Sequence, residues 1–235
     1  MNNIEFKHLI SNATYCTKYE PIVNVKTDEV YAYEALSKFN LDNRIMSTED
    51  IFRKLHHNNE LFFTLEKRNK ELQVRHFDMD KKLFVNFDAD IFVSSEQKEY
   101  WEKFLLKHQE KVVVEITENG SDDEASAKII REFSSWLNKK DIMCALDDFA
   151  QDGSMFSFFI MNRCQYIKLD KSFIKQIKYN MNYIPFLKGL LQTIKMNNQK
   201  SIIEGVETYA DYDFVKTLDC DYMQGFYFND LSFER

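Results

Sequence analysis

The chain has 235 residues, of which 44% are hydrophobic and 15% aromatic, and its formal net charge at pH 7 is -7. This length and composition suffice for one large domain with a substantial core, and they argue against wholesale disorder. The acidic balance argues against a broad basic face that would follow nucleic-acid phosphates, so no DNA or RNA polymer is expected as a partner.

Strands and helices are predicted to alternate along most of the chain. Residues 1–18 carry no motif and are expected to form a short leading helix or a cover. Strands at 19–25 and 29–35 follow, and the tight connection between them is typical of an antiparallel hairpin. Short apolar runs predict the later strands, at 83–87, 112–116, 143–146, 166–169, 202–205 and 222–228.

Helical periodicity fills the segments between these runs. Ser47-Thr48-Glu49-Asp50 resembles a helix start, and the apolar stripe after it continues to Leu65. A helix over 173–196 contains Pro185, which is expected to break or kink it into two pieces. Further helices are predicted over 95–108, from Ser121 and from Thr208. Strands alternating with helices indicate a mostly parallel sheet in one compact domain that spans residues 1–235.

Most of the predicted strands end in a side chain that can bind a cation or an anion. Any one of these residues alone could be a helix cap or a solvated loop residue. Together they are expected to meet at the carboxyl ends of the strands, where barrel enzymes gather their active sites. The residues are Glu34, Asn86, Glu115, Asp147, Asp148, Lys168, Glu204 and Gln224.

The chemistry of this set indicates a metal-dependent enzyme that acts on an anionic substrate. The adjacent carboxylates of Asp147 and Asp148 repel each other unless a proton or a metal lies between them. Oxygen ligands without histidine or cysteine suit magnesium, manganese or calcium and disfavour zinc. Lys168 has apolar neighbours, so its ammonium is expected to point at a compensating negative group. No glycine-rich motif of the P-loop or Rossmann kind is present.

These residues stand in short motifs that resemble those of the EAL domain family, bacterial phosphodiesterases that act on cyclic di-GMP. The namesake tripeptide is Glu34-Ala35-Leu36, and the resemblance extends over about 19–228. The further matching motifs are Phe84-Val85-Asn86, Glu115-Ile116-Thr117-Glu118, Asp147-Asp148-Phe149, Lys168-Leu169-Asp170, Glu204-Gly205-Val206-Glu207 and Gln224-Gly225.

The resemblance implies an α/β fold, a modified TIM-like (β/α)8 barrel with one antiparallel strand. It implies hydrolysis of cyclic di-GMP to linear pGpG, with two Mg2+ or Mn2+ ions in each active site activating a water. The implied metal ligands are Glu34, Asn86, Glu115 and Asp147 for one ion, and Asp147, Asp148 and Glu204 for the other.

The resemblance also assigns roles to residues around the metals. Glu204 would take the proton of the attacking water, Lys168 would orient that water, and Glu118 would tether the loop after Asp148. The implied substrate-binding residues are Glu20, Lys38, Glu207 and Gln224.

Three departures from the family pattern concern the surroundings of the metal site. After Asp147-Asp148-Phe149 the family usually has Gly-Thr-Gly-Tyr-Ser-Ser, whereas residues 150–155 read Ala-Gln-Asp-Gly-Ser-Met. Lys38 replaces an arginine and lacks its bidentate fork for phosphate. Glu20 replaces a glutamine, and its acid could either repel a phosphate or accept from a guanine N–H.

Two other functions stay open at this point. The altered loop suggests a weakly active or inactive EAL module that binds cyclic di-GMP or a protein partner as a regulator, although such a module would need no metal ligands. The third candidate is a different magnesium-dependent barrel enzyme, such as an enolase-like lyase with Lys168 as its base. Because the family often dimerises near the altered loop, a homodimer is also open.

The termini and cysteines indicate a cytoplasmic location without a membrane partner. The first residues lack the apolar stretch of a secretory signal, and no stretch is long and uncharged enough to cross a bilayer. The scattered cysteines lack a Cys-x-x-Cys pair and are expected to be reduced thiols rather than a disulfide frame or a zinc site. They are Cys16, Cys144, Cys164 and Cys220.

Overall fold

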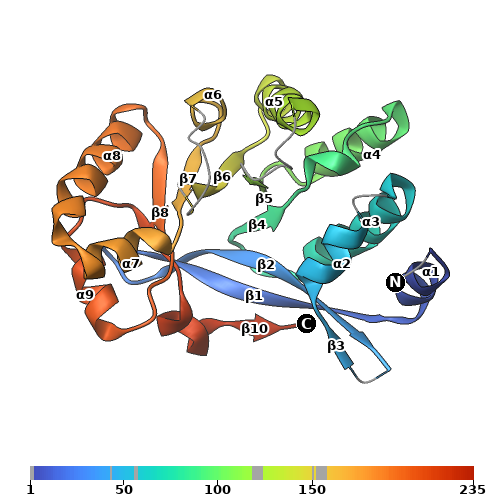
Figure 1. Ribbon diagram of the computed structural model, residues 1–235, viewed down its shortest axis with the longest axis horizontal. Coiled ribbons are helices and arrows are strands. Elements are labelled where there is room, and N and C mark those ends of the chain that lie inside the picture. Colours follow the sequence, from blue (N-terminus) through green and yellow to red (C-terminus); the bar gives the residue numbers. More distant parts are fainter. Residues whose placement is uncertain (1–2, 43, 56–57, 118–123, 150, 152–157) are drawn as a thin grey trace.

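A closed barrel of eight strands forms the centre of the computed structural model, which describes residues 3–42, 44–55, 58–117, 124–149, 151 and 158–235 (Figure 1). The barrel strands are β1 (Thr14–Asn24), β2 (Val30–Leu41), β4 (Lys82–Asn86), β5 (Val112–Thr117), β6 (Cys144–Phe149), β7 (Tyr166–Leu169), β8 (Lys200–Ile203) and β9 (Tyr222–Met223). Two short strands, β3 (Arg44–Met46) and β10 (Phe233–Glu234), pair antiparallel with β2 and β1, respectively.

One barrel strand runs against the others. Strand β1 is antiparallel to both of its barrel neighbours, β2 and β9, whereas β2 and β4 to β9 pair in parallel. The expected TIM-like barrel with one antiparallel strand is therefore confirmed. The predicted hairpin is also confirmed. After its turn, β2 runs back beside β1 along almost the full length of both strands.

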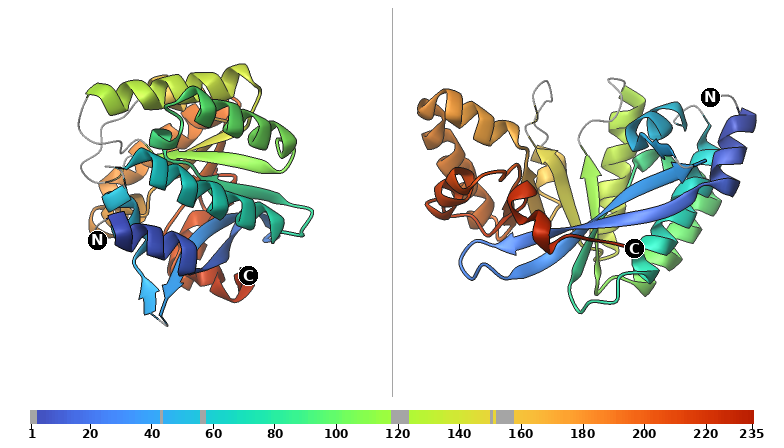
Figure 2. Two further views of the ribbon diagram at one scale, coloured as in Figure 1. Left: turned by 90° about the vertical axis from the view of Figure 1, so that its right-hand side faces the viewer. Right: turned by 90° about the horizontal axis from the view of Figure 1, so that it is seen from below.

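Helices cover the outside of this barrel, with α2 to α5 on one side and α7 to α9 on the other (Figures 1 and 2). A large apolar layer fills the space between the barrel and these helices, and a second cluster fills the barrel interior. The helices are α1 (Asn3–Asn12), α2 (Thr48–Leu55), α3 (Asn59–Arg75), α4 (Ser95–Lys107), α5 (Glu124–Lys139), α6 (Phe158–Met161), α7 (Ser172–Tyr179), α8 (Ile184–Met196) and α9 (Tyr209–Lys216), with 3-10 turns η1 (Ala89–Ile91), η2 (Met181–Tyr183) and η3 (Phe226–Leu231). Within the described residues no helix is long and apolar enough to span a membrane.

Helix predictions held best where the sequence carries a clear start or stop. The expected leading helix is α1, and the break near Pro185 is confirmed, since that residue lies in the first turn of α8. The continuous stripe from Ser47 to Leu65 was wrong as a single helix. It belongs to α2 and α3, and Asn58 caps the second by accepting from the Leu61 N–H at 3.2 Å. The expected helix start at Ser121 lies outside the described residues.

Strand lengths were the weakest prediction. Strand β1 begins at Thr14 and β2 ends at Leu41, because the two pair with each other beyond the barrel wall. The predicted strand 222–228 was wrong beyond Met223. The chain leaves the barrel there and turns into η3, since Gly225 folds back onto the loop after β8.

Gly225 permits this turn because it has no side chain. A Cβ at this position would lie 2.3 Å from the Val206 carbonyl oxygen and 2.5 Å from the Val206 nitrogen. Hydrogen bonds on either side hold the approach, from the Val206 N–H to the Gln224 carbonyl at 3.1 Å and from the Tyr227 N–H to the Val206 carbonyl at 3.0 Å. This close approach of the two backbones fixes the position of Gln224, the residue before Gly225.

Replacing Gly225 by alanine should therefore destabilise the fold by about 2 kcal/mol or more, because either the backbone or Val206 must move. Urea unfolding measures this loss. Gly189→Ala in α8 is the matched control, since nothing lies within 4 Å of its missing Cβ, and it should gain about 0.5–1 kcal/mol. Equal effects of the two substitutions would contradict the packing described for Gly225.

Candidate active site

Polar side chains line one end of the barrel interior, and their placement follows from strand geometry. Successive side chains on a strand point to opposite faces, so a residue two positions beyond an inward-facing one also points inward. On β5, for example, Val113 lies in the interior cluster and Glu115 is the second residue after it. The same step leads from the interior residues Ala32, Phe84, Ala145, Tyr166, Ile202 and Tyr222 to Glu34, Asn86, Asp147, Lys168, Glu204 and Gln224.

The ammonium of Lys168 lies at the centre of this group. It is 1% exposed, and four carboxylates surround it, three from strands β2, β5 and β6 and one from Glu204 directly after β8. The distances from its Nζ are 3.2 Å to Glu34 Oε2, 2.6 Å to Glu115 Oε1, 2.8 Å to Asp147 Oδ1 and 2.9 Å to Glu204 Oε1. Burial opposes the charged form, but the four acids outweigh it and raise the pKa of Lys168 well above its ordinary value. The expected negative environment of this lysine is confirmed.

Two amide side chains orient Glu34 from both sides. Asn86 Nδ2 donates to Glu34 Oε1 at 3.0 Å, and Gln224 Nε2 donates to Glu34 Oε2 at 2.6 Å. Burial alone would raise the pKa of Glu34, but Lys168 and these two donors together lower it. Glu34 is therefore held as a carboxylate, which is the form that binds a cation.

A bulge brings two adjacent acids to the same site. Neighbouring residues of a regular strand would point to opposite faces, but β6 advances three residues from Leu146 to Phe149 while β7 advances two, from Ile167 to Leu169. Asp148 occupies the extra position with φ 51°. As a result, oxygens of Asp147 and Asp148 both lie within 4.8 Å of one another and of a Glu204 oxygen.

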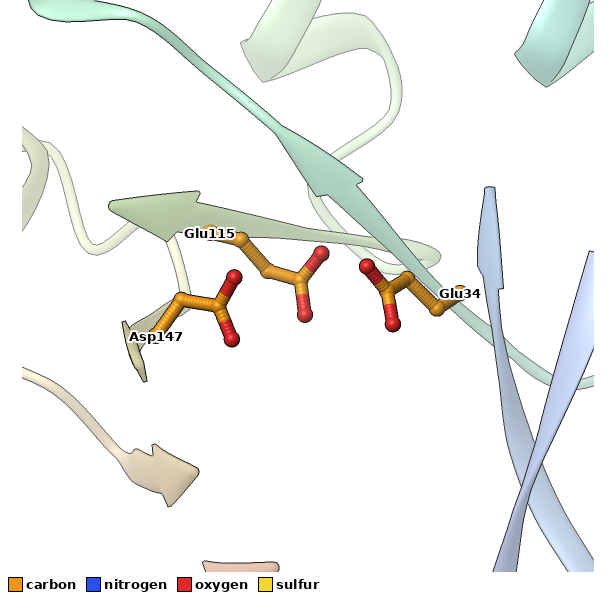
Figure 3. A group of neighbouring side chains, drawn as sticks. All are labelled: Glu34, Glu115 and Asp147. Carbon is orange, nitrogen blue, oxygen red and sulfur yellow. The ribbon is translucent and has the colours of Figure 1, made fainter. Parts of the chain in front are cut away.

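The carboxylates fall into two groups that share Asp147. In the first group, oxygens of Glu34, Glu115 and Asp147 lie within 4.8 Å of one another, and the three side chains point toward a common centre (Figure 3). Glu115 Oε2 is buried without a hydrogen-bond partner among the described residues, as expected of an oxygen that a cation would satisfy. This set of oxygen donors fits one or two hard divalent cations.

In a comparison with protein families, the EAL domain matches residues 4–230. This match agrees with the order of the motifs along the strands. The chain belongs to the EAL domain family. Curated relatives include the probable cyclic di-GMP phosphodiesterase PdeN of Escherichia coli K12, 24% identical over 95% of this chain and 44% of that protein. The cyclic di-GMP phosphodiesterase TpdA of Vibrio parahaemolyticus is 22% identical over 94% of this chain and 38% of its own. The chain thus spans about two fifths of the length of the first curated relatives that it matches.

Solved structures of other EAL domains share the fold of this one at low sequence identity. The FimX EAL domain from Pseudomonas aeruginosa bound to c-di-GMP has a TM-score of 0.79 at 19% identity, covering 95% of this chain and 93% of that one. The MucR phosphodiesterase in its c-di-GMP complex has a TM-score of 0.75 at 20% identity, covering 95% and 94%. Bacillus subtilis YkuI, solved with c-di-GMP and calcium, has a TM-score of 0.75 at 18% identity, covering 97% and 57%.

A cavity of about 200 Å³ in this EAL domain is lined in part by three of these carboxylates, Glu34, Asp148 and Glu204. Three of the four sequence-predicted substrate residues, Glu20, Glu207 and Gln224, line it. Glu20 pairs with Lys18 at 2.7 Å. Three further lining residues were missed by the sequence reasoning: Asp170, Lys171 and Phe226. Their signal was their position, since the first two follow β7 directly and the third follows Gln224-Gly225.

One predicted site residue, Lys38, is not brought into this group, and another is not among the described residues. Lys38 does not line the cavity, and its ammonium forms an ion pair with Glu234 of β10 at the surface of the barrel. Lys38 lies away from the strand-end carboxylates because it belongs to the part of β2 that extends beyond the barrel. Glu118 lies outside the described residues, so its proposed tethering of the loop is not tested.

The buried acids of this EAL domain make its stability without metal depend on pH. Burial, followed by the charge of Asp147, raises the pKa of Asp148 from 3.8 to about 6. Burial, reinforced by Asp147 and Glu34 against the opposing Lys168, raises the pKa of Glu204 from 4.5 to about 8. Acids with raised pKa values bind more protons in the folded state, so their contribution is complete at low pH and is lost as pH rises through these values.

We therefore expect the free energy of unfolding in chelator to fall from about pH 5 to about pH 8. The lowered pKa of Glu34 acts below this window and the raised pKa of Lys168 above it, so neither reverses the sign. Urea unfolding across this pH range, with chelator and with Mn2+, measures the effect. Stability in chelator that rises with pH would contradict it.

Proposed function

We propose that this EAL domain hydrolyses cyclic di-GMP to linear pGpG with two divalent cations, Mg2+ or Mn2+. The observation that carries the proposal is the presence of two clusters of three carboxylates each, with Asp147 common to both. Relatives of the chain are named cyclic di-GMP phosphodiesterases, and structures of similar fold hold c-di-GMP. Bacillus subtilis YkuI, one of the structures of similar fold, was solved in complex with substrate c-di-GMP and calcium, a cation that prefers oxygen ligands.

The metal ligands we propose are the residues that the strands deliver to the mouth of the barrel. Glu34, Asn86, Glu115 and Asp147 would hold one cation, and Asp147, Asp148 and Glu204 the other. When bound, the cations would supply an acidified water and would neutralise charge on the phosphodiester. Asn86 Nδ2 now donates to Glu34, which leaves its carbonyl oxygen as the ligand atom.

Residues of this chain would then handle the proton and the water. Glu204 is half-buried and lines the cavity, where its carboxylate would accept the proton of the attacking water. The Lys168 ammonium would donate to the attacking water and orient it, once the carboxylates around this lysine turn to the cations. Gln224 would keep Glu34 in place through its 2.6 Å hydrogen bond.

The cavity offers partners for the rest of a cyclic dinucleotide. Lys171 provides a cation beside the site for a phosphate. Glu20 and Glu207 would accept from guanine N–H groups, and the 66% exposed ring of Phe226 would stack on a base. Lys38 could contact the substrate only after leaving Glu234, so its predicted role needs a rearrangement of that ion pair.

One specific observation favours the alternative of a regulatory module. Lys38, which stands where the family has an arginine, is paired away from the cavity, and residues 150–155 depart from the usual loop sequence. A module that only binds cyclic di-GMP would tolerate both changes. The metal-ligand set argues for the enzyme, because a binding module has no need for buried acids that repel one another.

Incubating pure protein with cyclic di-GMP and Mn2+ or Mg2+, and following the products by chromatography, tests the proposal. We expect pGpG to appear with either metal and to be absent in chelator. Substrate binding without turnover, measured by calorimetry on the same sample, would support the regulatory module instead. Neither binding nor turnover would return the enolase-like lyase to consideration. Whether the chain forms a homodimer stays a prediction, which light scattering of the same sample tests.

A further inference from the structure

Two buried cysteines lie in contact behind the strands that carry the active site. The Sγ atoms of Cys144 and Cys164 are 3.1 Å apart, and the residues are 0% and 3% exposed. The other two cysteines have their polar contacts elsewhere, Cys16 with Glu234 at 4.0 Å and Cys220 with the Val215 carbonyl at 3.9 Å. All four are free thiols.

The backbone holds the two thiols in register. Cys144 begins β6, and Cys164 lies two residues before Tyr166, the first residue of the neighbouring β7. The Gln165 N–H donates to the Cys144 carbonyl at 2.9 Å, and the Cys144 N–H donates to Gln165 Oε1 at 2.8 Å. A disulfide requires the sulfurs to approach to about 2.05 Å, so the gap to be closed is about 1 Å.

A surface hollow leads to one member of the pair. Cys164 lines a cavity of about 480 Å³ at the end of the barrel opposite the candidate active site. Most of its lining is polar amide, and Asn162, Asn197 and Asn198 at its rim are exposed. A small polar oxidant can therefore reach the neighbourhood of Cys164, whereas Cys144 lies deeper, beneath it.

We propose that Cys144 and Cys164 form a site of reversible oxidation by a peroxide. The Cys164 sulfur attacks hydrogen peroxide, the O–O bond breaks, and water leaves as Cys164 becomes a sulfenic acid. The Cys144 sulfur then displaces the hydroxyl of the sulfenic acid, which leaves as a second water once protonated. Two thiols and one hydrogen peroxide thus give one disulfide and two waters. A dithiol in excess reverses the reaction by thiol–disulfide exchange.

The position of this cross-link relates it to the catalytic strands. The segment between the two cysteines, residues 145–163, includes Asp147, Asp148 and the loop whose sequence departs from the family. The oxidised pair would tie both ends of that segment together at the base of the barrel. The inference uses no metal and no substrate, so it stands independently of the proposed function.

Peptide mapping of the folded protein tests the inference. After treatment with hydrogen peroxide in chelator, and alkylation under denaturing conditions, we expect the peptides of Cys144 and Cys164 to be linked, with a loss of about 2 Da. Cys16 and Cys220 should remain alkylated, and a reducing dithiol should restore all four free thiols. The same treatment in urea, where the fold no longer pairs these sulfurs, should abolish the preference for this pair.

Cysteine variants provide matched controls. The double variant Cys16→Ser and Cys220→Ala should still form the cross-link, whereas Cys144→Ala and Cys164→Ala should each prevent it. If a single variant fails to fold, the map of the unaltered protein still decides. Oxidation that is absent, that stops at a sulfinic acid on Cys164, or that joins different chains through Cys16 would overturn the inference.

Discussion

Replacing Glu34 by glutamine should lower the rate of cyclic di-GMP hydrolysis by at least about 100-fold, because one proposed ligand of the first cation loses its charge. The residue is 6% exposed and contacts Lys168, Asn86 and Gln224, so the amide would fill nearly the same space. Metal titration by calorimetry should show weaker binding, and chromatography of pGpG should show the loss of rate.

The matched control for Glu34→Gln is Glu29→Gln, which removes an equal charge from an exposed position in the hairpin turn. This control should keep both the metal affinity and the rate of the unaltered protein. A Glu34→Gln protein that hydrolyses cyclic di-GMP at the original rate would contradict the assignment of Glu34 as a metal ligand. Lost turnover with unchanged metal binding would place Glu34 on the substrate instead.

Replacing Lys168 by methionine should destabilise the metal-free protein by about 3–5 kcal/mol, because it leaves buried carboxylates without their central cation. Divalent cations should recover much of this loss, since they bind the same acids in the folded state and not in the unfolded chain. Turnover should stay low even with metal, because the water loses its orienting ammonium. Urea unfolding with chelator and with Mn2+ separates these effects.

An exposed lysine provides the comparison for Lys168→Met. Lys195 pairs with Asp219 at 2.5 Å on the surface, where an ion pair is worth little, so Lys195→Met should leave the free energy of unfolding almost unchanged. If Lys168→Met were as stable as the unaltered protein in chelator, the four contacts would not act as the charge balance described here. A Lys168→Met protein with full turnover would remove the lysine from the mechanism.

The strand-end residues could be predicted because one simple rule generates the site. An apolar run that ends in a polar residue places that residue at the mouth of a parallel barrel, and the inward step of two residues explains why Glu115 and not Val114 faces the centre. The antiparallel strand was also predictable, since the connection after Val25 is too short for a crossover.

The remaining features depend on contacts that the sequence does not encode locally. The bulge at Asp148 is set by pairing with β7, and a regular strand would have turned that acid away. The separation of Lys38 from the cavity depends on how far β1 and β2 pair beyond the barrel, and on Glu234 nearly two hundred residues later. Lys171 and Phe226 line the cavity through the path of the chain after β7 and β9.

Anomalous diffraction from a crystal grown with Mn2+ would locate the cations. We expect two manganese peaks, one among Glu34, Asn86, Glu115 and Asp147 and one among Asp147, Asp148 and Glu204, with the Lys168 ammonium displaced from the carboxylates that turn to the cations. A map without manganese in this pocket, and with Lys168 still bound to its four acids, would contradict this expectation.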